Sequence, residues 1–267
     1  IKKRKIKSIL ICAVYSPSLM KFNLLQRAAL KFEYIFTQDE KSKELFNSIG
    51  HNNVVCSGDT RYDRVSLSKN LDEEVKYIKE FVNNKNCLIA GSTWNNDEKI
   101  IVDYINNSTS NIKYIIAPHE INERQINNLK SIINKKTILF SKISKDNINS
   151  ASVIIVNNIG TLSKLYKYAS LAYIGGGFNG EGKLHNSLEA AVFGLPIVIG
   201  KYYSKFPEAT SMVGNGGMFS VKNKIELKNK IDDLIQSKEM LLKTGKLNSD
   251  FINNNIGATT TILNHLN

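Results

Sequence analysis

The segment YIGGGFNGEGKLHNSLEAAVFGLPIVIG, residues 173–200, holds the residues best suited to bind a phosphorylated nucleotide. It predicts a strand, a glycine turn, a helix and a second strand. The three glycines at 175–177 permit positive φ angles and a close approach to the backbone, although a tight strand-to-helix turn alone also explains them. Asn186 and Glu189 share one face of the predicted helix start. An acidic residue there is favoured by the helix dipole and can accept hydrogen bonds from ribose hydroxyls.

Polar residues follow two other predicted strands. Ser92 and Thr93, in AGSTW, lie between a strand and a helix that is expected to begin near Asn95. Their amides and hydroxyls could hold an anion, or they could simply cap that helix. Pro118 should stop the next strand and leave His119 at the mouth of the sheet. His119 could stack on a base or donate to a phosphate, or it could be a surface histidine near a helix cap.

A further strand end lies in VNNIGTL, residues 156–162. The backbone of this turn could reach the edge of a nucleobase. The alternative is an ordinary helix start near Gly160. Since ligands of doubly wound sheets bind beyond the carboxyl ends of the strands, these turns are predicted to share one binding edge.

The elements that would position these turns alternate regularly. From residue 86 to about 245, continuous apolar strands alternate with helices, which is typical of a parallel sheet covered on both faces. The strands are expected at 87–92, 113–118, 137–141, 151–157, 171–177, 195–200 and 217–221. The intervening helices are expected at 96–107, 120–134, 160–170, 187–194 and 206–215, and residues 223–265 are expected to be helical.

The first part of the chain predicts only three strands, at 8–14, 33–38 and 53–58, and resembles the back half of a similar α/β domain. Helices are expected at 20–31 and 40–50, and a turn at 59–65 leads into an amphipathic segment at 64–83. We therefore expect a first domain over 1–83 and a complete doubly wound domain over 84–249. A C-terminal helix within 250–267 is expected to pack back across the domain junction.

The composition and net charge limit the classes of partner that this chain can have. The 267 residues carry a net charge of +12, which suits a phosphorylated substrate or an anionic membrane surface. A genomic bias toward Lys and Asn codons along the whole chain would explain the charge equally well. No run approaches the ~18 apolar residues of a membrane span, and no nucleic-acid-binding motif is present. In the absence of such a motif we expect no nucleic-acid partner, and because the four histidines lack metal-ligand spacing we expect no metal. Because residue 1 is Ile, the chain is expected to begin inside a longer protein.

The order of several motifs resembles the GT-B glycosyltransferases and, more narrowly, the 3-deoxy-D-manno-octulosonic acid (Kdo) transferases of lipopolysaccharide synthesis. The motifs are FEYIFTQDEKSKELFNSIG, SGDTRYDRV, AGSTW, IIAPHEI, NNIGTLSKLYKYASLAYIGGGF, HNSLEAAVFGLPIVIG and KFPEA. The resemblance implies two Rossmann-like doubly wound parallel sheets, the N-terminal one incomplete here. It also implies CMP-Kdo as donor, a lipid A precursor as acceptor and a peripheral location at the cytoplasmic face of the inner membrane. No separate cofactor is implied.

The resemblance also implies roles for individual residues. Arg61, in GDTRYD, matches a basic position that steadies charge in the transition state. The CMP contacts would come from Pro118, His119, Asn158, Ile159, Gly160, Asn186, Ser187, Leu188 and Glu189. With the residues singled out by the strand ends, the predicted donor site also includes Ser92, Thr93, Gly175, Gly176 and Gly177.

The chain departs from the family in two respects. It shows no counterpart of the N-terminal segment that carries the general base and a membrane-associating stretch, so this chain by itself is expected to lack its base. Asn157 stands where an acid is expected in close relatives. Two other classes stay open at this level: a GT-B enzyme that uses a UDP-sugar, and a non-catalytic nucleotide-binding fragment. Selective protection by CMP or by UDP would distinguish the donors.

Overall fold

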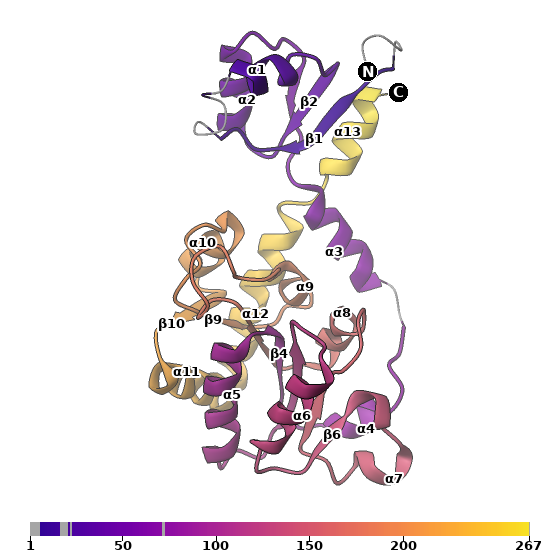
Figure 1. Ribbon diagram of the computed structural model, residues 1–267, viewed down its shortest axis with the longest axis vertical. Helices are drawn as coiled ribbons and strands as arrows, with labels where there is room; N and C mark the ends of the chain where they lie inside the picture. The colour runs from indigo at the N-terminus through magenta and orange to yellow at the C-terminus, as the bar shows by residue number, and fades with distance from the viewer. Residues whose placement is uncertain (1–5, 17–20, 22, 71–72, 267) are drawn as a thin grey trace. The chain divides into compact units, whose positions relative to one another are not determined.

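The computed structural model of this chain describes residues 6–16, 21, 23–70 and 73–266, and it divides into two compact α/β units (Figure 1). The first unit comprises Ile1–Ser68 and Asn253–Asn267, and the second comprises Lys69–Ile252. Each contains a parallel sheet. No helix within the described ranges is long and apolar enough to cross a membrane.

The first unit is built on a three-stranded parallel sheet with the order β1-β2-β3. Its small core contains Ile35, Phe46 and Val54. Helix α2 begins after Asp39, whose carboxylate accepts the Ser42 amide at 2.7 Å and caps the helix. The elements of this unit are β1 (Ile9–Ala13), α1 (Asn23–Ala29), β2 (Tyr34–Thr37), α2 (Glu40–Ser48), β3 (Val54–Cys56), α3 (Thr60–Asn70) and α13 (Ala258–Leu266).

The second unit is built on a seven-stranded sheet with the order β10-β9-β8-β4-β5-β7-β6, in which every pairing is parallel. The strands are β4 (Cys87–Thr93), β5 (Lys113–Pro118), β6 (Thr137–Leu139), β7 (Val153–Ile155), β8 (Leu171–Ile174), β9 (Ile197–Gly200) and β10 (Met218–Val221). The α-helices are α4 (Ile78–Val82), α5 (Asn95–Asn107), α6 (Glu123–Ser131), α7 (Lys145–Ile148), α8 (Leu162–Leu165), α9 (Leu188–Ala191), α10 (Pro207–Gly214), α11 (Lys224–Gln236) and α12 (Lys238–Asn253). Short 3₁₀ turns, η2 (Phe140–Lys142) and η3 (Tyr166–Tyr168), follow β6 and α8.

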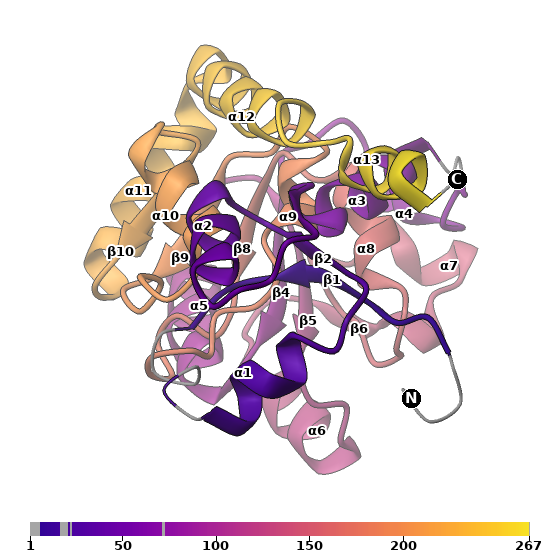
Figure 2. The same ribbon diagram turned by 90° about the horizontal axis from the view of Figure 1, so that it is seen from above.

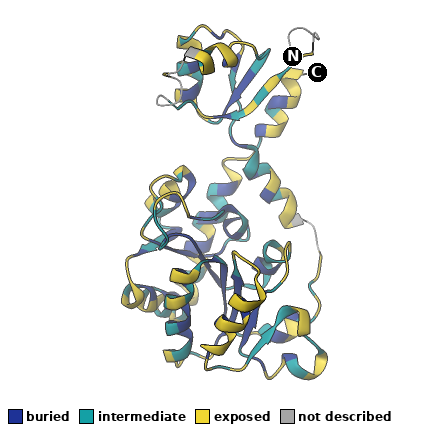
Figure 3. Ribbon diagram, in the orientation of Figure 1, coloured by how far each residue is buried: buried dark blue, intermediate teal, exposed yellow. Residues whose placement is uncertain are grey.

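The central strands are apolar along most of their length because helices cover both faces of the sheet. Figure 3 shows the central strands of this unit as mostly buried and the outer faces of its helices as exposed. Helices α10 and α11 pack beside β10, and α11 also contacts α5 (Figure 2). The predicted fold, two Rossmann-like parallel sheets with a smaller first one, is confirmed.

The chain leaves β4 toward β5 on one side and later returns to β8 on the other side. Strand order therefore reverses at β4, and loops that follow β4 and β8 diverge at this point. In open parallel sheets such a switch point creates a crevice at the carboxyl edge, where ligands bind. The predicted glycine turn after β8 and the AGSTW segment lie at this switch point.

The boundary between the units lies at residues 68 and 69 instead of near residue 83. Helix α4 belongs to the second unit because Ile78 and Phe81 are fully buried there, with the Lys113 ammonium 4.7 Å from the Phe81 ring. The Val75 amide also donates to the Tyr168 hydroxyl at 2.9 Å. The helical periodicity predicts that α4 is amphipathic, but it does not indicate which of the two sheets the apolar face of α4 packs against.

Several helix predictions are longer or shorter than the structure. Only 23–29 of the helix expected at 20–31 is described as α1; residues 20 and 22 lie outside the described residues, as do 71 and 72 of the segment 64–83. The turn expected at 59–65 is already helical from Thr60, since the Asp59 carboxylate accepts the Arg61 amide at 2.9 Å. The continuous helix expected at 223–265 is three helices, and a Gly257 with φ +116° precedes the last one.

Candidate functional site

The parallel sheet of the second unit brings most of the predicted donor residues to one edge. Ser92 and Thr93 end β4, and Pro118 ends β5. Residues 158–160 follow β7, and the glycine turn at 175–177 follows β8 directly. Because these strands are parallel, their carboxyl ends meet at the same edge. Arg61 lies in the first unit and is described separately below.

Ser92 makes a bulge in β4 and has a φ of +52°, a left-handed conformation that is uncommon for a residue with a side chain. The bulge turns the Ser92 carbonyl toward the glycine turn, where a Cβ on Gly175 would lie 2.2 Å from that oxygen. Strained backbone of this kind clusters at ligand sites. Neither Ser92 nor Thr93 is the N-cap of α5; that position is Trp94, and the Thr93 hydroxyl bonds Glu98 instead, at 3.3 Å.

The next two glycines of the turn are required by backbone packing. Gly176 has a φ of +97°, and a Cβ there would lie 1.9 Å from the Lys183 carbonyl oxygen. A Cβ on Gly177 would lie 2.7 Å from the Gly200 amide nitrogen. The glycines therefore fold the loop at 178–186 back against the sheet, whatever ligand the loop binds.

Asp97 is the residue that holds this edge together, and the sequence analysis did not single it out. Its carboxylate is fully buried and accepts four hydrogen bonds. The donors are the Trp94 amide (3.0 Å), the Tyr173 hydroxyl (2.6 Å), the Gly176 amide (2.8 Å) and the Asn179 side-chain amide (2.9 Å). Burial, and then the Asp97 charge, raise the pKa of Tyr173 well above its ordinary value, so the phenol stays a proton donor. The only signal in the sequence was an acid three residues after the helix cap.

Trp94, His119 and His185 form an aromatic group beside Asp97. The Trp94 and His119 rings stack at a centroid distance of 4.5 Å and an interplanar angle of 22°. The indole nitrogen of Trp94, which can only donate, donates to His185 Nε2 at 2.7 Å. His185 is therefore neutral, with its proton on Nδ1, and burial and then the neighbouring His119 lower its pKa. His119 is exposed but fixed by stacking, and its amide donates to the Thr93 carbonyl at 2.8 Å.

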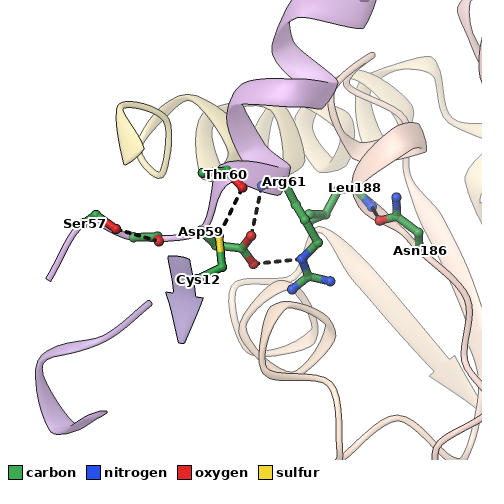
Figure 4. A network of polar contacts seen from close by, with 8 residues as sticks. Cys12, Ser57, Asp59, Thr60, Arg61, Asn186 and Leu188 are labelled. Carbon is green, nitrogen blue, oxygen red and sulfur yellow. Dashed lines mark hydrogen bonds and ion pairs between the residues drawn. The ribbon is translucent and has the colours of Figure 1, made fainter. Parts of the chain in front are cut away.

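Asn186 and Glu189 lie together, as their spacing predicts. Asn186 Nδ2 donates to Glu189 Oε1 at 3.2 Å, and Asn186 Oδ1 accepts the Leu188 amide at 3.1 Å (Figure 4). Leu188 is fully buried in the core. The Ser187 hydroxyl is buried and has no hydrogen-bond partner among the described residues. The helix that follows is the single turn α9, shorter than the 187–194 expected.

The turn after β7 is open to solvent. Asn158 and Gly160 are exposed, Gly160 has a φ of +84°, and the Ile159 side chain is 91% exposed. Asn157 instead makes structural bonds, because its side chain accepts the Ser141 amide at 3.0 Å and donates to the Ser141 hydroxyl at 2.8 Å. These bonds turn residues 140–142 into η2, where the sequence predicted a continuing strand.

In the first unit, Arg61 begins α3 and is fixed by Asp59. Arg61 Nε donates to Asp59 Oδ2 at 2.8 Å, and the Cys12 thiol lies 3.0 Å from the Thr60 hydroxyl (Figure 4). Arg61 lines a cavity of about 340 Å³ within this unit, together with Thr60, Asp63, Arg64, Leu67 and Thr259. The guanidinium is thus a positioned cation at a surface hollow.

Within the described ranges, no three His, Cys, Asp or Glu side chains come together in a metal-binding arrangement. The expectation of metal-free and cofactor-free function stays a prediction.

The chain is similar in sequence to curated Kdo transferases over most of its length. The chain is 30% identical over 234 residues to a 3-deoxy-D-manno-octulosonic acid transferase of Rickettsia prowazekii (strain Madrid E), covering 84% of this chain and 49% of that protein. It is 28% identical over 243 residues to the protein of the same name from Aquifex aeolicus (strain VF5), covering 88% and 62%. The chain thus spans less than two thirds of the length of both relatives. No protein-family model matches it.

Solved structures share the fold at low sequence identity. The C-terminal CMP-Kdo binding domain of WaaA from Acinetobacter baumannii superposes with a TM-score of 0.57 and 16% identity, covering 73% of this chain and 99% of that one. A putative UDP-N-acetylglucosamine 2-epimerase from Listeria monocytogenes gives a TM-score of 0.63 and 11% identity over 99% of this chain and 70% of that one. Sequence and fold together identify this chain as a relative of the 3-deoxy-D-manno-octulosonic acid transferases, with the α/β architecture of the GT-B glycosyltransferases.

Proposed function

We propose that this chain binds CMP-Kdo and takes part in the transfer of Kdo to a lipid A precursor in lipopolysaccharide synthesis. The observation that carries the proposal is the similarity to Kdo transferases across 84% of the chain. That similarity spans both units, including Arg61 and the strand ends at the sheet edge. The alternatives of a UDP-sugar donor and of a non-catalytic fragment have no comparable support.

The geometry of the sheet edge supports a nucleotide donor. Asn186 orients the Glu189 carboxylate, and a carboxylate in that position can accept hydrogen bonds from the two ribose hydroxyls. The buried Ser187 hydroxyl leaves one donor for the ligand, since a buried polar group normally has a partner. The exposed Ile159 offers an apolar contact for the base.

Positive charge supports an anionic donor and acceptor. Asp59 holds the Arg61 side chain in place, and a cation that needs no reorganisation is suited to stabilise negative charge that develops in a transition state. The net charge of +12 also suits a phosphorylated lipid at the anionic cytoplasmic surface of the inner membrane. Complete transfer also requires a base to deprotonate the acceptor hydroxyl, and no residue of this chain is assigned to that step. Donor binding is therefore the property to measure.

The test is the thermal stability of the chain with CMP, with UDP and without nucleotide. A ligand at about 100 times its Kd adds ~2.7 kcal/mol to the folded state, which for a unit of this size raises Tm by roughly 5–10 °C. We expect CMP to give this shift in the wild type, UDP to give less, and Glu189→Ala to lose most of it. Glu239→Ala, which removes an exposed carboxylate from α12, is the control. Equal shifts with CMP and UDP would reject the Kdo-specific donor.

A further inference from the structure

A second, smaller cavity adjoins the predicted CMP contacts. Its volume is about 220 Å³. It shares Asn95, Glu98 and Gln125 with a larger cavity of about 720 Å³, and the smaller space by itself has room for one sugar-sized group. The cavity is lined by Thr93, Trp94, Asn95, Glu98, His119, Glu120, Gln125 and Asn179. Thr93 and His119 are also predicted donor residues, so the cavity continues from that site.

Glu98 is a half-buried carboxylate of this cavity with few hydrogen bonds. Its carboxylate is half-buried, and its side chain has one hydrogen bond among the described residues, from the Thr93 hydroxyl at the long distance of 3.3 Å. A carboxylate has about four acceptor positions. Burial is the main cause that raises the pKa of Glu98 to about 7, with the charge of Asp97 adding to it and the Thr93 bond opposing it. This partial desolvation without compensation is relieved when a ligand supplies hydroxyl groups.

Trp94 provides an aromatic surface next to the polar Glu98 carboxylate. Stacking on His119 and the bond to His185 fix the orientation of the indole. The indole, with the Lys183 ammonium 5.5 Å from its centroid, is thereby held rigidly in the cavity wall beside Glu98 and the side-chain amides of Asn95, Gln125 and Asn179. Sugars have this dual character: their C–H faces pack on aromatic rings, and their hydroxyls bond carboxylates and amides.

We propose that this cavity is the subsite for the hydroxyl-bearing part of the sugar acid carried by the donor, and that Glu98 accepts hydrogen bonds from the sugar hydroxyls. The inference rests on the proposed function for the identity of the sugar. The hydroxyls of the sugar, and not its ionised carboxylate, enter this cavity, because Glu98 and Glu120 would repel a further negative charge. Glu98 is a specificity residue for the sugar and takes no part in binding CMP.

Trp94 provides a direct probe, because it is the single tryptophan of the chain and lies in the cavity wall. Free Kdo is titrated into the chain, with and without saturating CMP, while Trp94 fluorescence is recorded. CMP binding is measured separately by thermal shift. The variants are Glu98→Ala, Glu98→Gln and the control Glu123→Ala, which removes an exposed acid of α6 outside the cavity.

We expect Kdo to change Trp94 fluorescence in the wild type and in Glu123→Ala, and Glu98→Ala to weaken Kdo binding about tenfold. Glu98→Gln should recover most of the affinity, since its amide keeps an acceptor oxygen. The CMP shift should be the same in all four proteins. An unchanged Kdo affinity in Glu98→Ala, or no fluorescence response in a wild type that binds CMP, would overturn the subsite. A Kdo response without a CMP shift would keep the sugar site and reject the proposed donor.

Discussion

At the scale of single residues, one buried carboxylate organises the candidate donor edge. Asp97 has no contact with solvent, yet it needs no cation because four hydrogen-bond donors surround it. A carboxylate that accepts several hydrogen bonds is stable in a protein interior, whereas loss of one acceptor leaves a buried donor unpaired. Asp97 joins the start of α5 to Tyr173 at the end of β8 and to Gly176 in the glycine turn.

Asp97→Asn should therefore lower the free energy of unfolding by about 2–3 kcal/mol, since the amide replaces one acceptor oxygen with a donor that faces other donors. Urea denaturation followed by circular dichroism measures the change. Asp103→Asn is the matched control: it lies on the same helix, and its exposed ion pair with Lys224 is worth at most about 1 kcal/mol. Equal losses in the two variants would show that the hydrogen bonds of Asp97 have no special weight.

At the scale of elements, the turn from β8 toward α9 depends on backbone conformation more than on side chains. Gly175 accommodates the Ser92 carbonyl of the β4 bulge, and Gly176 accommodates the Lys183 carbonyl of its own loop. Two neighbouring strand ends thereby interlock at the switch point of the sheet. The loop at 178–186, which leads from the glycine turn to α9, also supplies Asn179 to the cavity and His185 to the indole of Trp94.

Gly176→Ala should lower the free energy of unfolding by about 3 kcal/mol or more, because it adds a clash to the ~1–2 kcal/mol cost of a left-handed conformation. The control is Gly180→Ala in the same loop, where φ is +104° but no atom lies within 4 Å of the added Cβ. Gly180→Ala isolates the conformational cost, and the difference between the two variants measures the clash. If both lose the same stability by urea denaturation, the Lys183 carbonyl has moved aside.

At the scale of the whole molecule, the chain begins and ends in the same compact unit. Helix α13 joins the small sheet through contacts with residues far away in sequence: the His265 ring meets the edge of Phe36 at 6.1 Å, and Ala258 lies against Gly58. Asp63 accepts the Gly257 amide at 2.6 Å and the Thr259 amide at 2.7 Å, so it caps the start of α13. Since three strands form only a small core, this helix supplies an important part of the burial.

Burial alone would raise the pKa of Asp63, but the bonds from Gly257 and Thr259 outweigh it and hold the pKa below its ordinary value. A carboxylate with a depressed pKa stabilises the folded state above its unfolded pKa of about 3.8, and that contribution is lost as pH falls through the folded pKa. Asp63→Asn should therefore weaken the first unit by about 1–2 kcal/mol at pH 7 and by progressively less as the pH falls below 3.8 and through the folded pKa.

Hydrogen exchange of β1–β3 measures this effect, with roughly tenfold faster exchange expected for each 1.4 kcal/mol at pH 7. Glu44→Gln, an exposed acid of α2, should leave the exchange unchanged, as should the strands of the second unit in either variant. Faster exchange of both units in Asp63→Asn would mean that they unfold together.

The sequence by itself determined the class of fold and the edge at which to look for a site. The continuous apolar stretches CLIA and VIIV, within CLIAGS and ASVIIVN, arise because both faces of a parallel sheet are covered, and this burial is readable from the sequence. The adjacency of Asn186 and Glu189 was also readable, because their spacing is local.

Tertiary structure decided what joins segments far apart in the chain. Three of the four partners of Asp97 lie 76–82 residues away, and those of Asp63 lie 194–196 residues away, so no local pattern identifies them. The same reason applies to α4, whose apolar face matches either sheet, and to Glu98, whose unsatisfied carboxylate becomes evident only when the cavity around it has formed. Local periodicity specifies elements, whereas long-range packing chooses their partners.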